Sequence, residues 1–179
     1  ALLFFLERCG RVCYKSEEKI RAHSDEDFVR SLIARGHESV LEHVSLSAKF
    51  IVDRGVSHEL VRHRIASFSQ ESTRYCNYGR DDFEGQITVI EPCYPARGPE
   101  PYLRWLGACE EAERAYFDLL NYGLTAQEAR AVLPHSLKTE IVMTANVREW
   151  RHFFRLRTSA AAHPQMREGA KLLLKDARR

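Results

Sequence analysis

The chain has 179 residues, of which 44% are hydrophobic and 29% are charged. This composition is ordinary for a soluble globular protein and excludes a disordered chain, and the length predicts one domain over residues 1–179. With 27 Lys and Arg against 25 Asp and Glu, the net charge is only +2, which excludes a protein whose whole surface binds a polyanion. A local cluster of cations is still compatible with this balance.

The first half of the chain predicts a helix, a strand, a short helix and a second strand. Ser24, with an acidic residue three positions later, is typical of a helix N-cap, and Gly36 is a plausible end for that helix. Residues 44–52 alternate between apolar and other side chains, which predicts a half-buried strand. A turn then leads to a short helix over residues 56–64, and residues 86–91 predict the second strand.

The second half predicts mostly helices, after a Pro- and Gly-rich surface loop over residues 94–101. A helix that Gly123 ends is followed by a capping box at Thr125 and a helix that stops before Pro134. Three apolar helix faces are expected: Trp105, Cys109, Ala112, Tyr116 and Leu119; Met143, Val147, Trp150 and Phe154; Met166, Ala170, Leu173 and Ala177. Because strands are few and irregularly placed, we expect an α+β fold with a small, mostly antiparallel sheet and several packed helices.

Membrane and secretory signals are weak. The most apolar stretch, Leu2 to Leu6, is too short for a signal-peptide core or a membrane span, so we expect no membrane partner. The five cysteines are odd in number and form no C-x-x-C pair, which favours free thiols in a reducing cytoplasm. The chain begins at Ala1 rather than Met, and we expect its start to be trimmed.

Common catalytic and metal-binding motifs are missing from the sequence. His58 and His63 are five residues apart, whereas two zinc ligands on one helix face need a spacing of four. His37 and His43 also have the wrong spacing for two ligands. Cys9 and Cys13 are four residues apart, but the sequence has no second pair of cysteines to complete a zinc site, so we predict no metal. The sequence contains neither a G-x-S-x-G elbow nor a Gly-rich phosphate loop, so any nucleotide must be bound by side chains.

Cations gather in three places. Residues 62–75 combine arginines with hydroxyl side chains, Arg130 follows the capping box, and residues 148–157 carry Arg148, His152, Arg155 and Arg157. Guanidinium forks beside hydroxyls suit a phosphate or diphosphate. Solvated arginines paired with acids such as Glu149, or a single-strand nucleic-acid surface with interleaved aromatics, are the alternatives. The near-neutral charge favours a compact anionic small molecule, and we expect no nucleic acid partner.

These residues resemble a known family. Arg62-His63-Arg64, followed after seven residues by Ser72, resembles the R-H-R-x7-S signature of flavin-dependent thymidylate synthases. Four further blocks resemble that family in the right order: residues 10–14, 36–43, 129–134 and 146–157. The resemblance implies methylation of dUMP to dTMP, with methylenetetrahydrofolate as carbon donor and FAD as hydride source, recharged by NADPH. It also implies a homotetramer with active sites shared between subunits.

The resemblance also implies the site residues by motif position. Arg157 is the expected catalytic residue, because a guanidinium against the pyrimidine stabilises its anionic form. The expected dUMP contacts are Glu59, Arg62, Gln70, Glu71, Ser72, Thr73, Arg74, Arg130 and Arg157. The expected FAD contacts are Ser39, Arg62, His63, Arg64, Ile65, Gln70, Asn146, Val147, Arg148 and His152.

The chain departs from the family pattern at a few positions. Many members have Asn and Glu where this chain has Ser69 and Gln70, and others have Asn in place of His152. Both ends are shorter than in typical members, so we expect both to be trimmed. Ser72 is interpreted as a substrate ligand rather than a nucleophile, and Cys93 as structural. The alternative function is a non-catalytic domain that binds a nucleotide or a single strand with the same cations and aromatics.

Overall fold

The predicted α+β class is confirmed. The computed structural model describes residues 1–80, 83–93 and 99–177. Three strands form one antiparallel sheet in the order β1–β3–β2, where β1 is Ser45–Asp53, β2 is Ala66–Gln70 and β3 is Lys138–Asn146. The central strand therefore comes last in sequence and joins the two earlier ones, pairing Phe50 with Ile141 on one side and Phe68 with Met143 on the other.

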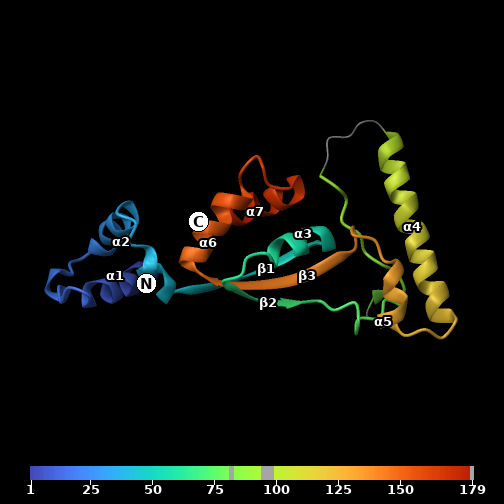
Figure 1. Cartoon of the computed structure of the whole chain (residues 1–179), viewed down its shortest axis with the longest axis horizontal. Coiled ribbons are helices and arrows are strands. Elements are labelled where there is room, and N and C mark those ends of the chain that lie inside the picture. The colour runs from blue at the N-terminus through green and yellow to red at the C-terminus, as the bar shows by residue number, and fades with distance from the viewer. Residues whose placement is uncertain (81–82, 94–98, 178–179) are drawn as a thin grey trace.

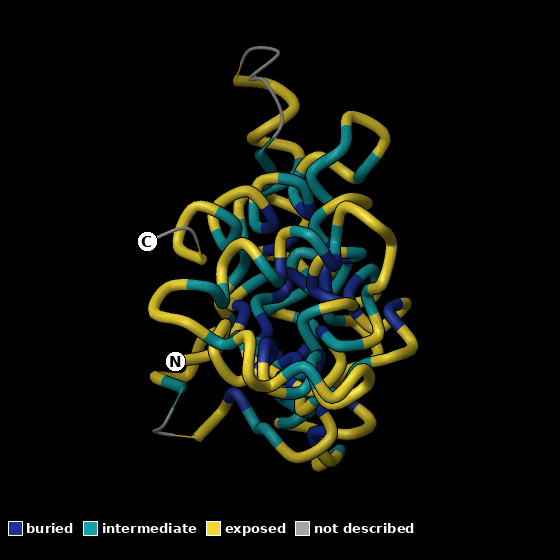
Figure 2. Tube along the Cα trace, turned by 90° about the vertical axis from the view of Figure 1, so that its left-hand side faces the viewer, coloured by how far each residue is buried: buried dark blue, intermediate teal, exposed yellow. Residues whose placement is uncertain are grey.

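Helices cover one face of this sheet (Figure 1). They are α3 (Arg54–Leu60), α6 (Val147–Arg157) and α7 (Pro164–Asp176). Alternate residues of β3 point toward them, and Ile141 and Met143 are fully buried against Trp150 and Phe153 of α6. Burial of such large apolar side chains drives this layer together, and Figure 2 shows the buried residues concentrated in the middle of the molecule.

The remaining helices lie at the two ends of the sheet (Figure 1). At one end are α1 (Leu2–Val12), α2 (Ser24–Ala34) and the 3₁₀ turns η1 (Glu17–Lys19) and η2 (Glu38–His43). At the other end are α4 (Pro99–Asn121), α5 (Ala126–Ala129) and the 3₁₀ turn η4 (Arg130–Val132). Each end has its own small apolar cluster, around Leu41 at the first and around Tyr116 at the second.

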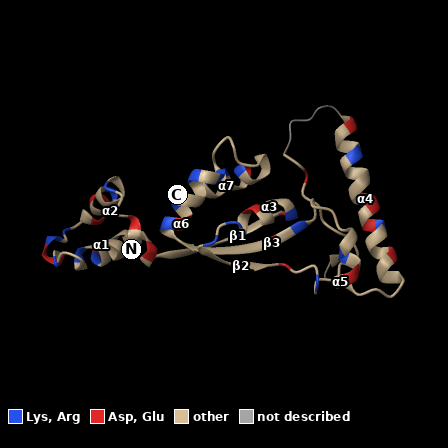
Figure 3. Ribbon diagram, in the orientation of Figure 1, with Lys and Arg blue, Asp and Glu red and all other residues tan. Residues whose placement is uncertain are grey.

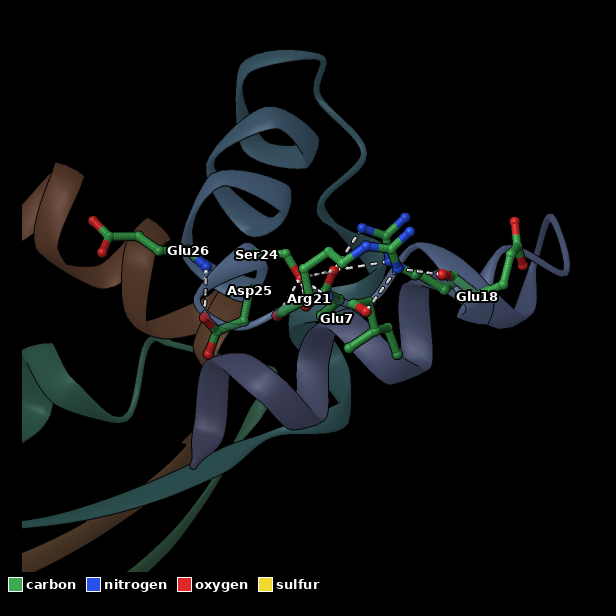
Figure 4. Close-up of polar contacts among 8 residues, drawn as sticks. Glu7, Glu18, Arg21, Ser24, Asp25 and Glu26 are labelled. Carbon is green, nitrogen blue, oxygen red and sulfur yellow. Dashed lines mark hydrogen bonds and ion pairs between the residues drawn. The ribbon is translucent and has the colours of Figure 1, made fainter.

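A buried carboxylate ties α1 to α2. Glu7 is fully buried and accepts hydrogen bonds from Arg11 (Nη2 to Oε1, 2.6 Å) and from the hydroxyl of Ser24 (Oγ to Oε2, 2.8 Å). Figure 4 shows Ser24 and Glu7 facing each other, with Arg21 beside them. A buried charge needs such partners, so this contact fixes the pair of helices that precedes η2.

Several predictions of local structure are confirmed. The alternating strand is β1, shifted by one residue. Gly36 ends α2 with a φ of +75°, and the His37 amide donates to the Leu32 carbonyl, as in a Schellman motif. Gly123, with a φ of +87°, follows α4. The capping box at Thr125 opens α5, and the last predicted helix is α7.

Other predictions are wrong. Ser24 is the first residue of α2 and its hydroxyl binds Glu7, so it is not the cap. The short helix ends at Leu60 rather than at residue 64. Residues 86–91 form no strand and contribute only an isolated bridge from Val89 to Leu137. Met143 belongs to β3, so the apolar face assigned to one helix spans a strand and the helix that follows it.

Two further strands and one helix were not predicted: β2, β3 and α1. Of the predicted loop, residues 94–98 lie outside the described residues, and Pro99 already begins α4. All five cysteines are free thiols, as predicted. Among the helices described here, none combines the length and the apolar character needed to cross a membrane.

Candidate functional site

A hollow of about 890 Å³ lies where β3 passes into α6. The Asn146 side chain caps α6 by accepting a hydrogen bond from the Glu149 amide (2.9 Å), which turns the chain sharply out of the sheet. The hollow lies between this turn and η2. Four residues predicted from the sequence line it: Ile65, Asn146, Arg148 and His152.

Acidic side chains of η2 already form ion pairs with arginines that line this hollow. Arg148 Nη1 lies 2.5 Å from Glu42 Oε1, and Arg151 Nη2 lies 3.4 Å from Glu38 Oε1. Both pairs join residues more than a hundred positions apart. The sequence interpretation missed both carboxylates. The G-H-E-x-x-x-E-H block contains them, but nothing local in it indicates that they face α6. Figure 3 shows basic residues on α6 and α7 and mixed charges along α4.

Next to the hollow, His63 makes hydrogen bonds with two residues of α6, one at each ring nitrogen. Its Nδ1 lies 2.8 Å from Glu149 Oε1, and its Nε2 accepts a hydrogen bond from Arg157 Nε at 3.0 Å. Arg157 also donates from Nη1 to Glu59 Oε2 (2.6 Å) and from Nη2 to the Glu59 carbonyl (2.9 Å). The structure thus brings together three predicted site residues, Glu59, His63 and Arg157, and adds Glu149, which was not predicted as a site residue.

The electrostatics of this group follow from burial. His63 is 4% exposed and Glu149 is 8% exposed. Desolvation lowers the pKa of His63 below its ordinary value, the hydrogen bond that its ring donates to Glu149 opposes that shift, and the nearby charge of Arg157 adds to it. Burial and the neighbouring guanidinium therefore favour the neutral form of the imidazole.

Part of this group has the spacing of a possible metal site. Within the described chain, ligand atoms of His63, Glu149 and His152 lie within 4.8 Å of one another. However, both ring nitrogens of His63 are engaged in hydrogen bonds, and the Arg157 cation lies against the ring. A second cation would be repelled here, so we assign no metal to these residues.

A second group of predicted residues lies beyond the other end of β2. Arg130 Nη1 donates to Thr73 Oγ1 at 3.5 Å, and Arg74 Nε donates to Gln127 Oε1 at 2.9 Å. Ser72 accepts a weak bond from the Arg74 amide at 3.3 Å. Exposed guanidinium groups beside hydroxyls can bind an anion, and the assignment of these residues to dUMP stays a prediction.

Gln70 and Glu71 are held by the sheet. The Gln70 amide donates to Ser57 Oγ (2.9 Å) and Thr139 Oγ1 (3.2 Å) beneath α3. The Glu71 carboxylate accepts from Tyr78 (3.1 Å) and pairs with Lys138 (3.2 Å). These contacts turn the Glu71 carboxylate toward a separate hollow of about 390 Å³.

The remaining predicted residues are dispersed. Ser39, Arg62 and Arg64 are exposed, and Val147 is half-buried against the cluster around Leu41. The five residues of β2, which extend over roughly 17 Å at about 3.3 Å per residue, separate the segment that holds His63 from the segment that holds Thr73. One chain therefore does not bring all the predicted dUMP residues together.

Comparison with known proteins agrees with the motif resemblance. The family model described as Thymidylate synthase complementing protein matches residues 5–179. A flavin-dependent thymidylate synthase of Geobacter sulfurreducens is 37% identical over 169 residues, covering 88% of this chain and 69% of that protein. The proteins of that name from Pyrococcus furiosus (36%, covering 93% and 68%) and Mycolicibacterium gilvum (37%, covering 90% and 70%) are similarly related.

The match covers nearly the whole chain, although the chain spans only about two thirds of the length of these relatives. It includes both the α6 hollow and the residues around Arg157 and Arg130. The chain therefore belongs to the Thy1 family, the family of the flavin-dependent thymidylate synthases.

Proposed function

We propose that this protein methylates dUMP at C5 of the uracil ring to give dTMP, with FAD as its cofactor. One observation carries the proposal beyond family membership: four predicted flavin contacts line a single hollow that adjoins the Arg157 group. Glu149 links the two, because it lines the hollow and also contacts His63, which binds Arg157.

The hollow suits a flavin dinucleotide. Its volume of about 890 Å³ falls in the range usual for small-molecule sites, roughly 300–1,000 Å³. Arg148, at the start of α6, lines it together with Arg151 and Arg155 further along the same helix, and guanidinium groups favour a diphosphate. When bound, FAD would supply the hydride that, with a one-carbon unit, completes the new methyl group.

Arg157 has the chemistry that the pyrimidine requires. Uracil C5 is a weak nucleophile, and a guanidinium held against the ring stabilises the anionic, enolate-like form that reacts. Arg157 is largely buried, with 16% of its side chain exposed, and its Nε and both Nη groups already make directed hydrogen bonds. A pyrimidine oxygen could replace the Glu59 carboxylate on Nη1 without moving the Nε contact.

The scheme requires no nucleophile from the protein. Ser72 Oγ contacts the Arg74 amide, which suits a ligand of the substrate phosphate. Burial raises the pKa of the Cys93 thiol, and its hydrogen bond with Glu168 raises it further, so that thiol is poorly suited to attack. This supports the interpretation of Cys93 as structural.

We also propose that active sites are shared within a homotetramer. The predicted dUMP residues form two groups at opposite ends of β2, so a second copy is needed to bring an Arg157 group close to a Thr73–Arg130 group. Methylenetetrahydrofolate and NADPH are the proposed co-substrates. We propose a cytoplasmic location, with which five free thiols are in keeping.

The absorption spectrum of the purified protein, recorded with and without dUMP, tests the function. We expect a yellow protein with a flavin spectrum that changes when dUMP is added, and NADPH oxidation that responds to dUMP. A colourless protein that also fails to bind added FAD would overturn the proposal. Retention of a nucleotide or a single strand without flavin would favour the non-catalytic alternative.

A further inference from the structure

The protonation of His63 can be read from its neighbours. A guanidinium nitrogen always donates and never accepts. Because Arg157 Nε–H points at His63 Nε2 at 3.0 Å, that ring nitrogen must carry its lone pair. The single ring proton of the neutral imidazole is therefore on Nδ1, from which it is donated to Glu149 Oε1 at 2.8 Å. The three side chains thus form a directed chain from a carboxylate through an imidazole to a guanidinium.

Each member of this chain is held by α6 or by the core. Glu149 lies in the first turn of α6, where a negative charge is favoured, and its amide is bound by Asn146. The His63 ring packs against Phe153, with ring centroids 5.1 Å apart. Arg157 ends the same helix. The imidazole therefore has little freedom to rotate or to exchange its partners.

We propose that Glu149 and His63 are positioning residues for Arg157, with Glu149 fixing the imidazole tautomer and His63 Nε2 fixing the plane of the guanidinium. The inference rests on the proposed function, in which that guanidinium faces the pyrimidine. With Nε held by His63 and Nη2 by the main-chain carbonyl of Glu59, Nη1 is the group left to exchange the Glu59 carboxylate for substrate.

This role differs from the flavin contact that the family resemblance implies for His63. Both ring nitrogens are already bonded within the chain, and the residue is 4% exposed. A hydrogen bond from the imidazole to a cofactor would have to break one of these bonds. The groups that face the ring are Glu149, Arg157 and His152, so protonation of His63 would set Nε2–H against the Arg157 cation and remove its acceptor.

Two amide replacements of His63 distinguish the roles of its two ring nitrogens. The amide of His63→Gln reaches about as far as Nε2 and can still accept from Arg157, whereas that of His63→Asn reaches only as far as Nδ1 and faces Glu149. We expect His63→Asn to lower kcat for dTMP formation by about tenfold more than His63→Gln does, as for loss of a hydrogen bond to a charged group. FAD affinity should change little in either variant.

The pH profile provides a second readout. The wild type should lose kcat at acid pH as His63 is protonated, whereas His63→Gln, which cannot titrate, should lack that acid limb. His58, an exposed histidine of α3, provides the control, and His58→Gln should keep the wild-type profile. Equal loss of kcat in the Gln and Asn variants, with a parallel loss of FAD affinity, would show that His63 is only a flavin or structural residue.

A nitrogen-15 spectrum of the histidine rings keeps the inference testable apart from turnover. We expect the His63 resonance of the wild type to show a protonated Nδ1 and an unprotonated Nε2. The opposite tautomer, or a charged ring at neutral pH, would overturn the inference even in an active enzyme. A wild type that shows the expected tautomer but makes no dTMP would instead contradict the proposed function.

Discussion

Replacing Glu42 with Gln is expected to strengthen FAD binding. Glu42 holds Arg148 at 2.5 Å across the α6 hollow, so a diphosphate that binds Arg148 must first displace this carboxylate. The variant removes that competition and also removes a negative charge from a hollow that would receive an anion. Gln keeps the size and the hydrogen-bonding oxygen of the side chain, so the geometry of η2 should be preserved.

The magnitude follows from the exposure of the pair. The side chains of Arg148 and Glu42 are 52% and 45% exposed, and solvent-exposed ion pairs are worth about 0.2–1 kcal/mol. Removing the pair from the unbound protein should therefore lower the Kd for FAD by a factor of roughly 1.4 to 5. The effect should shrink as salt is added, because screening weakens the pair in the wild type.

Quenching of flavin fluorescence during titration of the flavin-free protein measures this Kd. Glu111→Gln is the control, since Glu111 forms a solvent-exposed ion pair with Arg114 on α4 and does not line the hollow. We expect the control to bind FAD as the wild type does. Weaker binding by Glu42→Gln would refute the reasoning, because it would mean that the carboxylate contacts the bound flavin rather than competing with it.

Three further outcomes are expected. Arg157→Lys keeps the charge but loses the planar fork, so dTMP formation should fall on the order of tenfold or more while FAD binding stays nearly unchanged; equal loss of both would make Arg157 a flavin or structural residue. Ser72→Ala should weaken dUMP binding by about fivefold, as for one hydrogen bond, yet leave turnover; complete inactivity with intact dUMP affinity would reopen a nucleophilic role. Ile141→Val, at a fully buried position of β3, should lower the free energy of unfolding in urea by about 0.5–1.5 kcal/mol; no change would mean that this core is loosely packed.

Local signals in the sequence predicted the local parts of the fold. The alternation in β1, the glycines at 36 and 123 and the capping box at Thr125 each depend on neighbouring residues, and each is confirmed. The pairing of β3 between β1 and β2 depends on contacts across the chain, which no local pattern specifies. The buried alternation of β3 was present in the sequence, but a helical spacing from Met143 to Phe154 obscured it.

The functional site divides in the same way, into residues that a local pattern indicates and partners that only contacts across the chain reveal. Motif resemblance indicated Asn146, Arg148 and Arg157, because the family signature is a local pattern. It did not indicate the partner of His63, because Glu149 lies 86 residues away along the chain. The sequence position of Glu149, next to Arg148, is equally compatible with an acid that is exposed to solvent. Only the cap at Asn146, which sets the first turn of α6 so that Glu149 contacts His63 between α3 and β2, gives that carboxylate its role.

The near-neutral charge of the chain now has a local explanation. The structure places acidic side chains against the clustered arginines themselves. Glu42 contacts Arg148, Glu38 contacts Arg151, and Glu59 contacts Arg157. An anionic ligand at any of these positions must exchange with a carboxylate, so it gains only the difference between two ion pairs. Such exchange favours ligands that satisfy several arginines at once, as a diphosphate or a nucleotide does, over single anions that satisfy one.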